Sequence, residues 1–473
     1  MCAKKISRRR FIGQASCAAI GSTTLLNSLA TLMGSTALAK SSLSNMDDYK
    51  ALVCILLAGG NDSYNMLVPR GNEAYAEYAT TRSTLALPQE SLLPINPLND
   101  DGRGYGIHPS MPHVQQLFEA GEAAFVANVG TLVEPIADTS DYYSGLKKRP
   151  LGLYSHSDQI EQWQTSVPQS RQAVGWGGRL ADIMKSLNSN QDISMNISLS
   201  GRNVFQSGNT VLEYSIENDG NGVRGIEGMR SWYGDSGILT ELRNAAVDSL
   251  VGDVYVNAFK KTFADVTRRS LDATELFANS IASVPAFTTQ FSEHYLSQDL
   301  QMVAKTIAAQ GSLGMNRQTF FTTFGGWDHH DEVLNNQQYM LGVLSRAIGD
   351  FFAALKELGM EDKVTLFTIS DFARTLTSNG NGSDHAWGGN AIVAGGAVDG
   401  QKIYGQYPDM YLQDNPLSFS RGRFLPTTSA DEYFAELALW FGVSPSDLAM
   451  VLPNIGNFYS PGSGSPLGFL PLS

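Results

Sequence analysis

Residues Ala51-Leu-Val-Cys-Ile-Leu-Leu-Ala58 form a continuous apolar run, and the turn residues Gly59, Gly60 and Asn61 follow it directly. A run of this length that ends in turn residues is typical of a parallel strand buried on both faces. Similar runs occur at 123–130, 318–325, 364–370 and 391–394, and helical spacing occurs at 112–120, 157–163, 177–187 and 339–358. Strands that alternate with helices predict an α/β fold, with a mostly parallel sheet and helices on both of its faces.

The chain has 473 residues, which leaves room for segments outside this sheet. Residues 201–237 are rich in Gly, Asn and Ser without a clear period, whereas 240–310 are largely helical in pattern. We therefore predict a signal peptide over 1–39, the N-terminal part of the α/β domain over 40–200, an insertion over 201–310 that is irregular and then helical, and the C-terminal part of the domain over 311–473. Ser429 and Glu432 form a capping-box pair that predicts a late helix.

The first 39 residues have the composition of an export signal, with five bases and no acid. Ser7-Arg8-Arg9-Arg10-Phe11-Ile12 opens a charge-free stretch that ends at Ala37-Leu38-Ala39, an Ala-x-Ala cleavage site. The arginine pair resembles a twin-arginine signal, which exports folded proteins. The alternative, a membrane anchor, has too few Leu, Ile and Val for a span of about 20 apolar residues. We predict a periplasmic or secreted bacterial protein, with the twin-arginine translocase as its partner during export and no stable membrane span after cleavage.

Cleavage after Ala39 removes five of the 33 bases and none of the 46 acids, so the remaining chain has a net charge of -18. This balance leaves no excess of cations to neutralise phosphates, which argues against nucleic acid as a partner. Cys54 is then the last cysteine, so an intrachain disulfide is excluded. Its place in the first apolar run predicts a buried and inert thiol.

Acidic and imidazole side chains follow three of the predicted strands and precede a fourth. These groups are Asn61-Asp62, Asp328-His329-His330, Asp371 and Asp384-His385. In an open α/β sheet, ligands bind beyond the carboxyl ends of the strands. Carboxylate oxygens and imidazole nitrogens are ligands of Zn, Mn and Fe. The pattern therefore predicts a metal site at one edge of the sheet.

Each of these groups also has a structural interpretation. Asn61 and Asp62 could close a turn through their own backbone, and Asp384 could cap a turn. Asp328, His329 and His330 directly follow a predicted buried strand, which favours the metal interpretation for them. The occurrence of all four groups beside predicted strands favours it as well. Three other histidines lie in helical or helix-start contexts, which predicts structural roles for them: His108, His113 and His294.

Ser155 precedes the predicted helix that contains Trp163. Free N–H groups at a helix N-terminus favour an anion or an alkoxide, so Ser155 is a candidate nucleophile. The alternative is an N-cap, a position that serine fills well, and the local sequence favours the cap. Arg374 follows Asp371 closely, and it could either clamp an anionic oxygen or form a structural ion pair.

Five motifs resemble the twin-arginine-exported DUF1501 family. They are Leu57-Ala-Gly-Gly-Asn-Asp-Ser-Tyr-Asn65, Ser155-His156, Gly325-Gly-Trp-Asp-His-His330, Ser370-Asp-Phe-Ala-Arg-Thr375 and Gly382-Ser-Asp-His-Ala-Trp-Gly388. The resemblance covers essentially the whole mature chain and is weakest between about 200 and 310. That family is similar to the alkaline phosphatase and sulfatase superfamily, whose members hold one or two metal ions at strand ends and attack phosphate or sulfate esters. The resemblance therefore implies an alkaline phosphatase-like fold.

The resemblance also implies roles for individual residues. It implies Ser155 as the nucleophile and a divalent metal, whether Zn, Mn, Fe or Ca, held by Asp62, Asp328, His330, Asp371 and His385. One position departs from the pattern, because the superfamily places a histidine after the acid at Asp371 and this chain has Phe372. Either His329, Asp384 or a water takes the place of that ligand, or the second metal is weak or absent.

These expectations predict an exported metal-dependent hydrolase of phosphate or sulfate esters with a serine nucleophile, acting on a small-molecule or glycan ester. Two alternatives stay open. The first is a non-catalytic exported protein on the same fold that binds carbohydrate or assists envelope assembly, which Phe372 favours. The second is a metal-dependent envelope transferase, which would use the same residues.

Overall fold

The computed structural model describes residues 49–216, 238–253, 255 and 257–472. The predicted signal peptide over 1–39 lies outside the described residues. From Tyr49 onward the described residues belong to one compact unit. Among the described helices, none combines the length and the apolar composition that crossing a bilayer requires.

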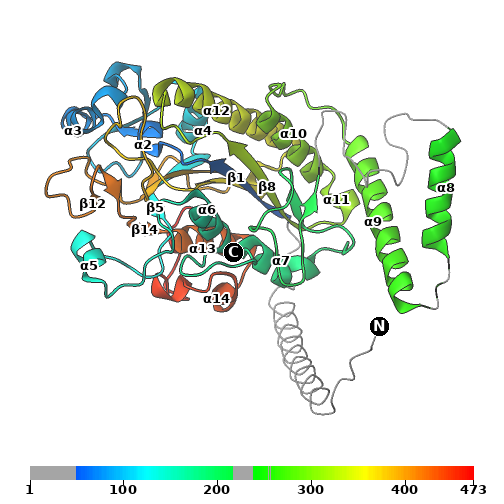
Figure 1. Cartoon of the computed structure of the whole chain (residues 1–473). Coiled ribbons are helices and arrows are strands. Elements are labelled where there is room, and N and C mark those ends of the chain that lie inside the picture. The colour runs from blue at the N-terminus through cyan, green and yellow to red at the C-terminus, as the bar shows by residue number, and fades with distance from the viewer. Residues whose placement is uncertain (1–48, 217–237, 254, 256, 473) are drawn as a thin grey trace, which may run out of the picture. The chain divides into compact units, whose positions relative to one another are not determined.

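In the described part of the chain, nine strands form a central sheet in the order β11-β5-β10-β9-β1-β8-β6-β7, with β14 paired to β5 (Figure 1). Its strands are β1 Lys50–Ala58, β5 Ala123–Gly130, β6 Asn196–Ser198, β7 Tyr214–Ser215, β8 Arg317–Gly325, β9 Val364–Ser370, β10 Gly389–Ala394, β11 Ile403–Gly405 and β14 Thr428–Ser429. Strand β10 runs antiparallel to its neighbours β5 and β9, and the other pairs are parallel. The predicted mostly parallel sheet is confirmed.

The other elements surround this sheet. Two small sheets contain β2 Leu67–Pro69, β3 Leu93–Ile95 and β4 Tyr105–Ile107, and β12 Ser418–Phe419 and β13 Arg423–Phe424. The helices are α2 Ser63–Met66, α3 Asn72–Arg82, α4 Pro112–Glu119, α5 Thr139–Ser144, α6 His156–Thr165, α7 Trp176–Met184, α8 Ile238–Gly252, α9 Ala258–Ala282, α10 Tyr295–Ala308, α11 Gln310–Leu313, α12 Val333–Leu358, α13 Ala430–Phe441 and α14 Leu448–Val451. Short 3-10 turns lie at 83–85, 89–91, 185–187, 361–363, 445–447 and 455–457.

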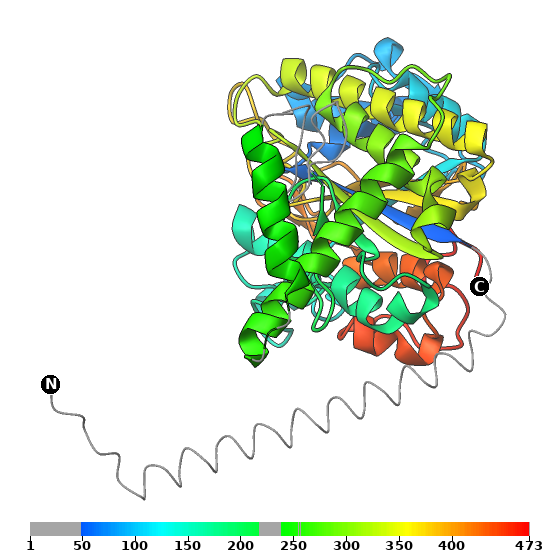
Figure 2. The same cartoon turned by 90° about the vertical axis from the view of Figure 1, so that its right-hand side faces the viewer.

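Strand β1 divides the apolar core into two layers, because successive side chains of a strand point to opposite faces. Val53 and Ile55 belong to the cluster that includes residues of α4, α10 and α12. Leu52 and Cys54 belong to the cluster that includes residues of α7 and α13. Figures 1 and 2 show α10 and α12 on one side of the sheet and α13 on the other. The prediction of helices on both faces is confirmed, and Cys54 is fully buried, which raises the pKa of its thiol.

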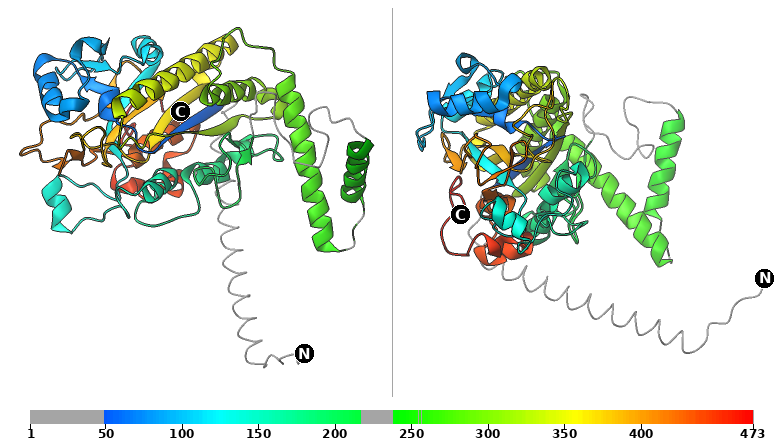
Figure 3. Two further views of the ribbon diagram at one scale, coloured as in Figure 1. Left: turned by 45° about the horizontal axis from the view of Figure 1, so that its top comes forward. Right: turned by 60° about the vertical axis from the view of Figure 1, so that its left-hand side comes forward.

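The range 201–310 contains both peripheral and central elements. Helices α8 and α9 meet near the turn that joins them and diverge from there (Figure 3), and the Arg268 guanidinium of α9 donates a hydrogen bond to the Val251 carbonyl of α8. Within the same range, β7 pairs with β6 in the central sheet, and α10 packs on α12 and β8. Strand β7 and helix α10, which both lie within 201–310, are therefore part of the α/β layers.

The capping box predicted at Ser429 and Glu432 is present at the start of α13. The long helix α12 begins at Val333, six residues before the predicted start at Tyr339. Its first turns are rich in Asn and Gln, which hides the apolar period from a sequence pattern. This extension matters for the site, because it brings the start of α12 close behind His330.

Candidate metal site

The sheet topology brings four chain segments to one edge. Strands β9, β1 and β8 are parallel neighbours, so the residues that follow them, including Asp371 and Asp328, emerge at the same edge. Because β10 is antiparallel to β9, the loop before β10, which carries His385, lies at this edge as well. His156, the first residue of α6, supplies the fourth segment.

Two glycines after β1 let these segments approach closely. A Cβ on Gly59 would lie 2.4 Å from the Asp328 backbone nitrogen, and a Cβ on Gly60 would lie 2.6 Å from the Phe372 ring. Both glycines have positive φ values, of 120° and 89°, which other residues rarely adopt. The Gly-Gly pair thus permits both the turn and the packing of the two neighbouring loops.

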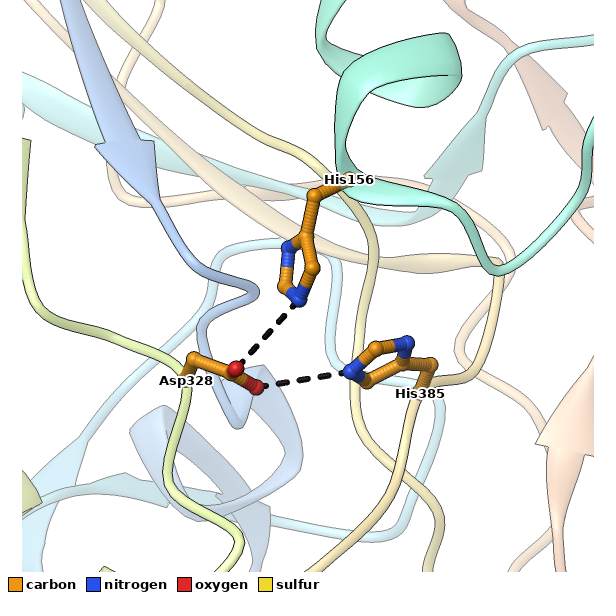
Figure 4. A group of neighbouring side chains, drawn as sticks. All are labelled: His156, Asp328 and His385. Carbon is orange, nitrogen blue, oxygen red and sulfur yellow. Dashed lines mark ion pairs between the residues drawn. The ribbon is translucent and has the colours of Figure 1, made fainter.

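Asp328 lies at the centre of a cluster of imidazoles (Figure 4). Its Oδ2 is 3.4 Å from His156 Nε2, and its Oδ1 is 3.4 Å from His385 Nε2. The potential ligand atoms of these three residues all lie within 4.8 Å of one another. His330 adds a further nitrogen, because its Nε2 is 3.1 Å from Asp328 Oδ1 and 3.0 Å from His385 Nε2. Three potential ligand atoms, from His156, Asp328 and His385, therefore converge, and His330 extends the group on the side of Asp328 and His385.

Each of the three imidazoles is held through its other nitrogen. His156 Nδ1 is 2.6 Å from an Asp371 oxygen, His330 Nδ1 is 3.0 Å from Asp384 Oδ1, and His385 Nδ1 is 2.7 Å from the Tyr154 carbonyl oxygen. Metal-binding histidines nearly always donate this second N–H to a carboxylate or a carbonyl. The partners orient the rings and leave the Nε2 lone pairs turned toward the cluster.

The pair of Nε2 atoms at His330 and His385 supports the same interpretation. A carbonyl oxygen and a carboxylate oxygen accept hydrogen bonds, so the Nδ1 atom of each ring carries the proton. In neutral rings, both Nε2 atoms then present lone pairs to each other at 3.0 Å, and a shared cation satisfies both. Nitrogen ligands of a tetrahedral zinc ion lie about 3.3 Å apart, which is close to the 3.0 Å between these two nitrogen atoms. The residues present fit a metal ion.

The electrostatics favour the ligand forms of the side chains. Burial acts to raise the pKa of Asp328, but the Arg374 guanidinium together with His330 and His156 outweighs it, so the pKa lies below the usual value and the carboxylate is ionised. Burial, assisted by Arg374, lowers the pKa of His385 and favours neutral imidazole. Burial raises the pKa of Asp371, and the hydrogen bonds from His156 and from the Gly59 N–H partly offset this shift.

Asp62 lies apart from these contacts, although it was predicted as a ligand. Its carboxylate forms an ion pair with Arg82 of α3, and both side chains are fully buried. Arg82 also donates to Asn65 Oδ1 and to the Thr375 carbonyl. A guanidinium from the same chain therefore neutralises the acid that follows β1.

The two residues predicted to be catalytic, Arg374 and Ser155, both have structural contacts: Arg374 pairs with Asp328, and Ser155 caps α6. The fully buried Arg374 donates to Asp328 Oδ1 at 2.5 Å and to the Gly60 carbonyl at 3.1 Å, so it fixes the central carboxylate. The Ser155 side chain accepts the Asp158 N–H as the N-cap of α6, and its Oγ is 3.3 Å from Ser157 Oγ. In this structure, Ser155 shapes the start of the helix that presents His156.

Phe372 packs against the cluster instead of supplying a ligand. Its ring centroid is 4.5 Å from that of His385 and 4.8 Å from that of His156. His329, one possible substitute, is buried, and its Nδ1 has no hydrogen-bond partner among the described residues. Asp384, the other, accepts from His330 Nδ1 and pairs with Arg421, so it acts on the cluster through His330.

Sequence reasoning missed His156 as a potential ligand. The signal in the sequence is its place beside Ser155 at a predicted helix start, one residue after the candidate nucleophile. Two of the three histidines with predicted structural roles have local hydrogen bonds, whereas the buried His113 Nδ1 has no hydrogen-bond partner among the described residues. His108 Nδ1 accepts the Ser110 N–H, and burial lowers the pKa of His108 to about 4. His294 Nδ1 caps α10 by accepting the Leu296 N–H.

The described chain is thus an α/β protein with a histidine and aspartate cluster at the carboxyl edge of its sheet. The DUF1501 family model, described as a protein of unknown function, matches residues 244–421, so the predicted resemblance is confirmed over this range, whereas the expected coverage of the whole mature chain is not. This range includes Asp328, His330, Asp371 and His385, whereas His156 lies before it. No curated protein matches the sequence.

Several solved structures are similar to this chain. The lipoteichoic acid synthase LtaP from Listeria monocytogenes has 9% identity, with 81% of this chain and 75% of that chain covered and a TM-score of 0.30. The sulfatase PsFucS1 from Pseudoalteromonas sp. has 10% identity, with 80% and 69% covered and a TM-score of 0.32. A TAB5 alkaline phosphatase mutant with Mg bound has 10% identity, with 75% and 94% covered and a TM-score of 0.30. Likenesses this low carry no inference about activity, which depends on the site itself.

Proposed function

We propose that the protein is an exported metal-dependent hydrolase of phosphate or sulfate esters. The observation that supports this most is the convergence of the Nε2 atoms of three histidines on Asp328 while each Nδ1 atom is held by an acceptor. The proposed ligands are His156, Asp328, His330 and His385. Asp371 and Asp384 would orient two of the rings, and Asp62 is left out because Arg82 already neutralises it.

The charges around the cluster suit an anionic substrate. The carboxylates in contact with it are those of Asp328, Asp371 and Asp384. Three guanidiniums balance them: Arg374 on Asp328, Arg421 on Asp384, and Arg423, which donates to the His385 carbonyl. A divalent cation would therefore make the site locally positive, although the protein as a whole is acidic.

Each group of the site would have a separate role in ester hydrolysis. A divalent cation at this site would polarise an ester oxygen and lower the pKa of a water molecule. Arg374 keeps Asp328 ionised and in place, and Asp371 keeps the His156 ring aligned. Because the Ser155 hydroxyl caps α6, we assign the attack to water, and Ser155 remains a second candidate for the nucleophile.

The test uses residues 40–473, which contain the whole described unit. The protein is stripped with a chelator, reloaded separately with Zn, Mn, Fe or Ca, and measured for bound metal and for turnover of aryl phosphates and aryl sulfates. We expect about one ion per chain, and its loss together with turnover in Asp328→Asn and His385→Ala. A protein that binds no ion under these conditions contradicts the proposal.

The nucleophile is tested separately with Ser155→Ala. If water attacks, this variant retains its metal and its turnover within a few-fold of the unmodified protein. Loss of turnover with the metal retained would instead assign the attack to Ser155. A circular dichroism melt checks that the altered N-cap, which contributes about 1 kcal/mol, has not unfolded the domain.

A second candidate function is a metal-holding exported protein without catalysis. Phe372 favours it, because an apolar ring packs on two of the imidazoles at a position where a ligand would complete a second metal site. Stoichiometric metal binding with no turnover of either ester class would support this candidate over the hydrolase.

A further inference from the structure

A segment beside the metal site exposes large apolar side chains to solvent. Within residues 142–151, here named the basic lip, Leu146 is 86% exposed, Tyr143 is 71% exposed and Leu151 is 45% exposed. Single exposed apolar residues are normal, but a group of them on one segment marks a contact surface.

The basic lip also carries three consecutive cations. Lys147, Lys148 and Arg149 lie between the exposed leucines, and the sequence has no acid between Asp141 and Asp158. The acids that precede the lip are only partly exposed, and their carboxylates accept backbone N–H groups: Glu134 from Lys148, Asp138 from Asp141, and Asp141 from Ala137. Lys148 and Arg149, by contrast, are exposed.

Aromatic packing holds the lip in place. The Tyr142 ring packs edge-on against Phe419 with centroids 4.8 Å apart, and against Trp387 with centroids 6.1 Å apart. The Arg149 guanidinium lies 4.9 Å from the centre of the Tyr142 ring. The packing of Tyr142 therefore fixes the backbone from which the exposed side chains of the lip extend.

The same contacts connect the lip to the metal site. Trp387, which supports the lip, is two residues from His385. The lip leads directly to Tyr154, whose carbonyl oxygen accepts from His385 Nδ1, and then to His156. A surface bound to the lip would therefore lie close to the candidate metal site.

We propose that the basic lip docks the exported protein on the surface of a bilayer that contains anionic lipids. Cations near such a surface each contribute about 1 kcal/mol, and apolar side chains add affinity by entering the boundary between head groups and acyl chains. A soluble polyanion would use the cations but gain nothing from an exposed Leu146. The proposal does not depend on the hydrolase, because docking needs no turnover.

Helix α9 provides a matched control. It also exposes large apolar residues, Phe259 at 87% and Phe263 at 70%. Its cations, the pairs Lys260-Lys261 and Arg268-Arg269, share the helix with the acids Asp265, Asp272 and Glu275. Lys261 pairs with Asp265 at 2.6 Å, and Arg268 donates to the Val251 carbonyl. The excess of basic over acidic residues is therefore smaller on this face than on the lip. The lip is linked to the metal site through the packing of Tyr142 on Trp387, and we name no such link for α9.

The experiment measures co-sedimentation of residues 40–473 with vesicles of phosphatidylcholine alone or mixed with phosphatidylglycerol. The variants are Leu146→Ser, the pair Lys147→Glu and Lys148→Glu, and the control pair Phe259→Ser and Phe263→Ser. All of these side chains are at or near the surface, and a thermal melt checks folding. Binding to a soluble sulfated dextran is measured in parallel.

We expect binding to the phosphatidylglycerol vesicles that weakens with salt, falls about tenfold in Leu146→Ser and at least tenfold in the charge-reversal variant, and is unchanged in the α9 control. Absence of vesicle binding would overturn the proposal. Binding by the lip variants that equals that of the unmodified protein would also overturn it, and so would loss of binding in the α9 control. Binding to the dextran that does not respond to Leu146→Ser, without vesicle binding, would identify a polyanion site instead. Metal content and ester turnover are not needed for any of these outcomes.

Discussion

Asp328 contacts every imidazole of the cluster and the buried Arg374 guanidinium. Its side chain is 45% exposed, whereas that of Arg374 is fully buried. The carboxylate is thus fixed by the buried Arg374 guanidinium and is accessible to solvent on its other side, where we propose that a metal ion binds. This arrangement explains how one aspartate can be held rigidly and still remain available as a ligand.

At the residue scale, we predict that Asp371→Asn weakens metal binding by about 10–100-fold, the usual effect of losing a carboxylate behind a metal-binding histidine. The negative charge that receives the His156 N–H is lost, so His156 is a poorer and less oriented ligand. Competition with a chromogenic chelator measures the affinity.

The control is Asp399→Asn, which removes an exposed carboxylate that pairs with Lys402 outside the cluster. Its metal affinity should equal that of the unmodified protein. Equal affinity in Asp371→Asn as well would show that Asp371 has no part in orienting His156.

At the element scale, the turn after β1 sets the distance between the loops of the site. We predict that Gly59→Ala destabilises the domain by about 3 kcal/mol or more, because the new Cβ would meet the Asp328 backbone in a conformation that alanine disfavours. Metal affinity should fall as well, since Asp328 must move. Urea denaturation and chelator competition provide the two measurements.

Gly121→Ala is the matched control for that variant. Gly121 also has a positive φ, of 77°, but a Cβ there would meet nothing within 4 Å. Only the backbone strain of about 1–2 kcal/mol should appear, with unchanged metal affinity. Similar effects of the two substitutions would mean that the contact with Asp328 is unimportant.

Helix α13 provides a pH-dependent prediction. Burial raises the pKa of Asp431 to about 8, and Ser166 and Arg179 only partly offset this shift. The folded state therefore keeps a proton that the unfolded chain loses above about pH 4, so the contribution of Asp431 to stability falls as the pH rises to about 8. Asp431→Asn should remove this dependence. Urea denaturation at pH 5, 7 and 9 should show the variant gaining stability relative to the unmodified protein, and parallel pH profiles would contradict the assignment.

At the scale of the whole molecule, export of a folded protein suits a site that is assembled from distant segments. Asp328 and His385 meet His156 only after the sheet has formed, so a metal bound before export would be carried out inside the folded domain. The predicted twin-arginine signal lies outside the described residues and remains a prediction.

We predict that replacing Arg8 and Arg9 by lysine leaves the uncleaved precursor inside a bacterial host. Fractionation followed by immunoblotting gives the result, and the control replaces Lys4 and Lys5 by arginine, which retains the arginine pair. Unimpaired export of the Arg8 and Arg9 variant would exclude the twin-arginine route.

Part of the fold was predictable because local patterns depend on local physics. The apolar runs at β1, β5 and β9 and the capping box at Ser429 specify buried strands and a helix start with little help from distant residues. The rule that strand ends share an edge also placed Asp328, His330 and His385 in one region. The early start of α12 was missed because its first turns lack an apolar period.

The amino-acid sequence by itself determined the mostly parallel sheet, its two covering layers and the acidic and imidazole residues at its edge, because apolar periodicity and the alternation of strands with helices are properties of neighbouring residues. Only the tertiary structure decided that His156 joins the cluster and that Asp62 is neutralised by Arg82. The first contact depends on Asp371, 215 positions away, and the second on how α3 folds back on the turn after β1. Such pairings depend on the distances that packing sets between segments, and no local pattern records those distances.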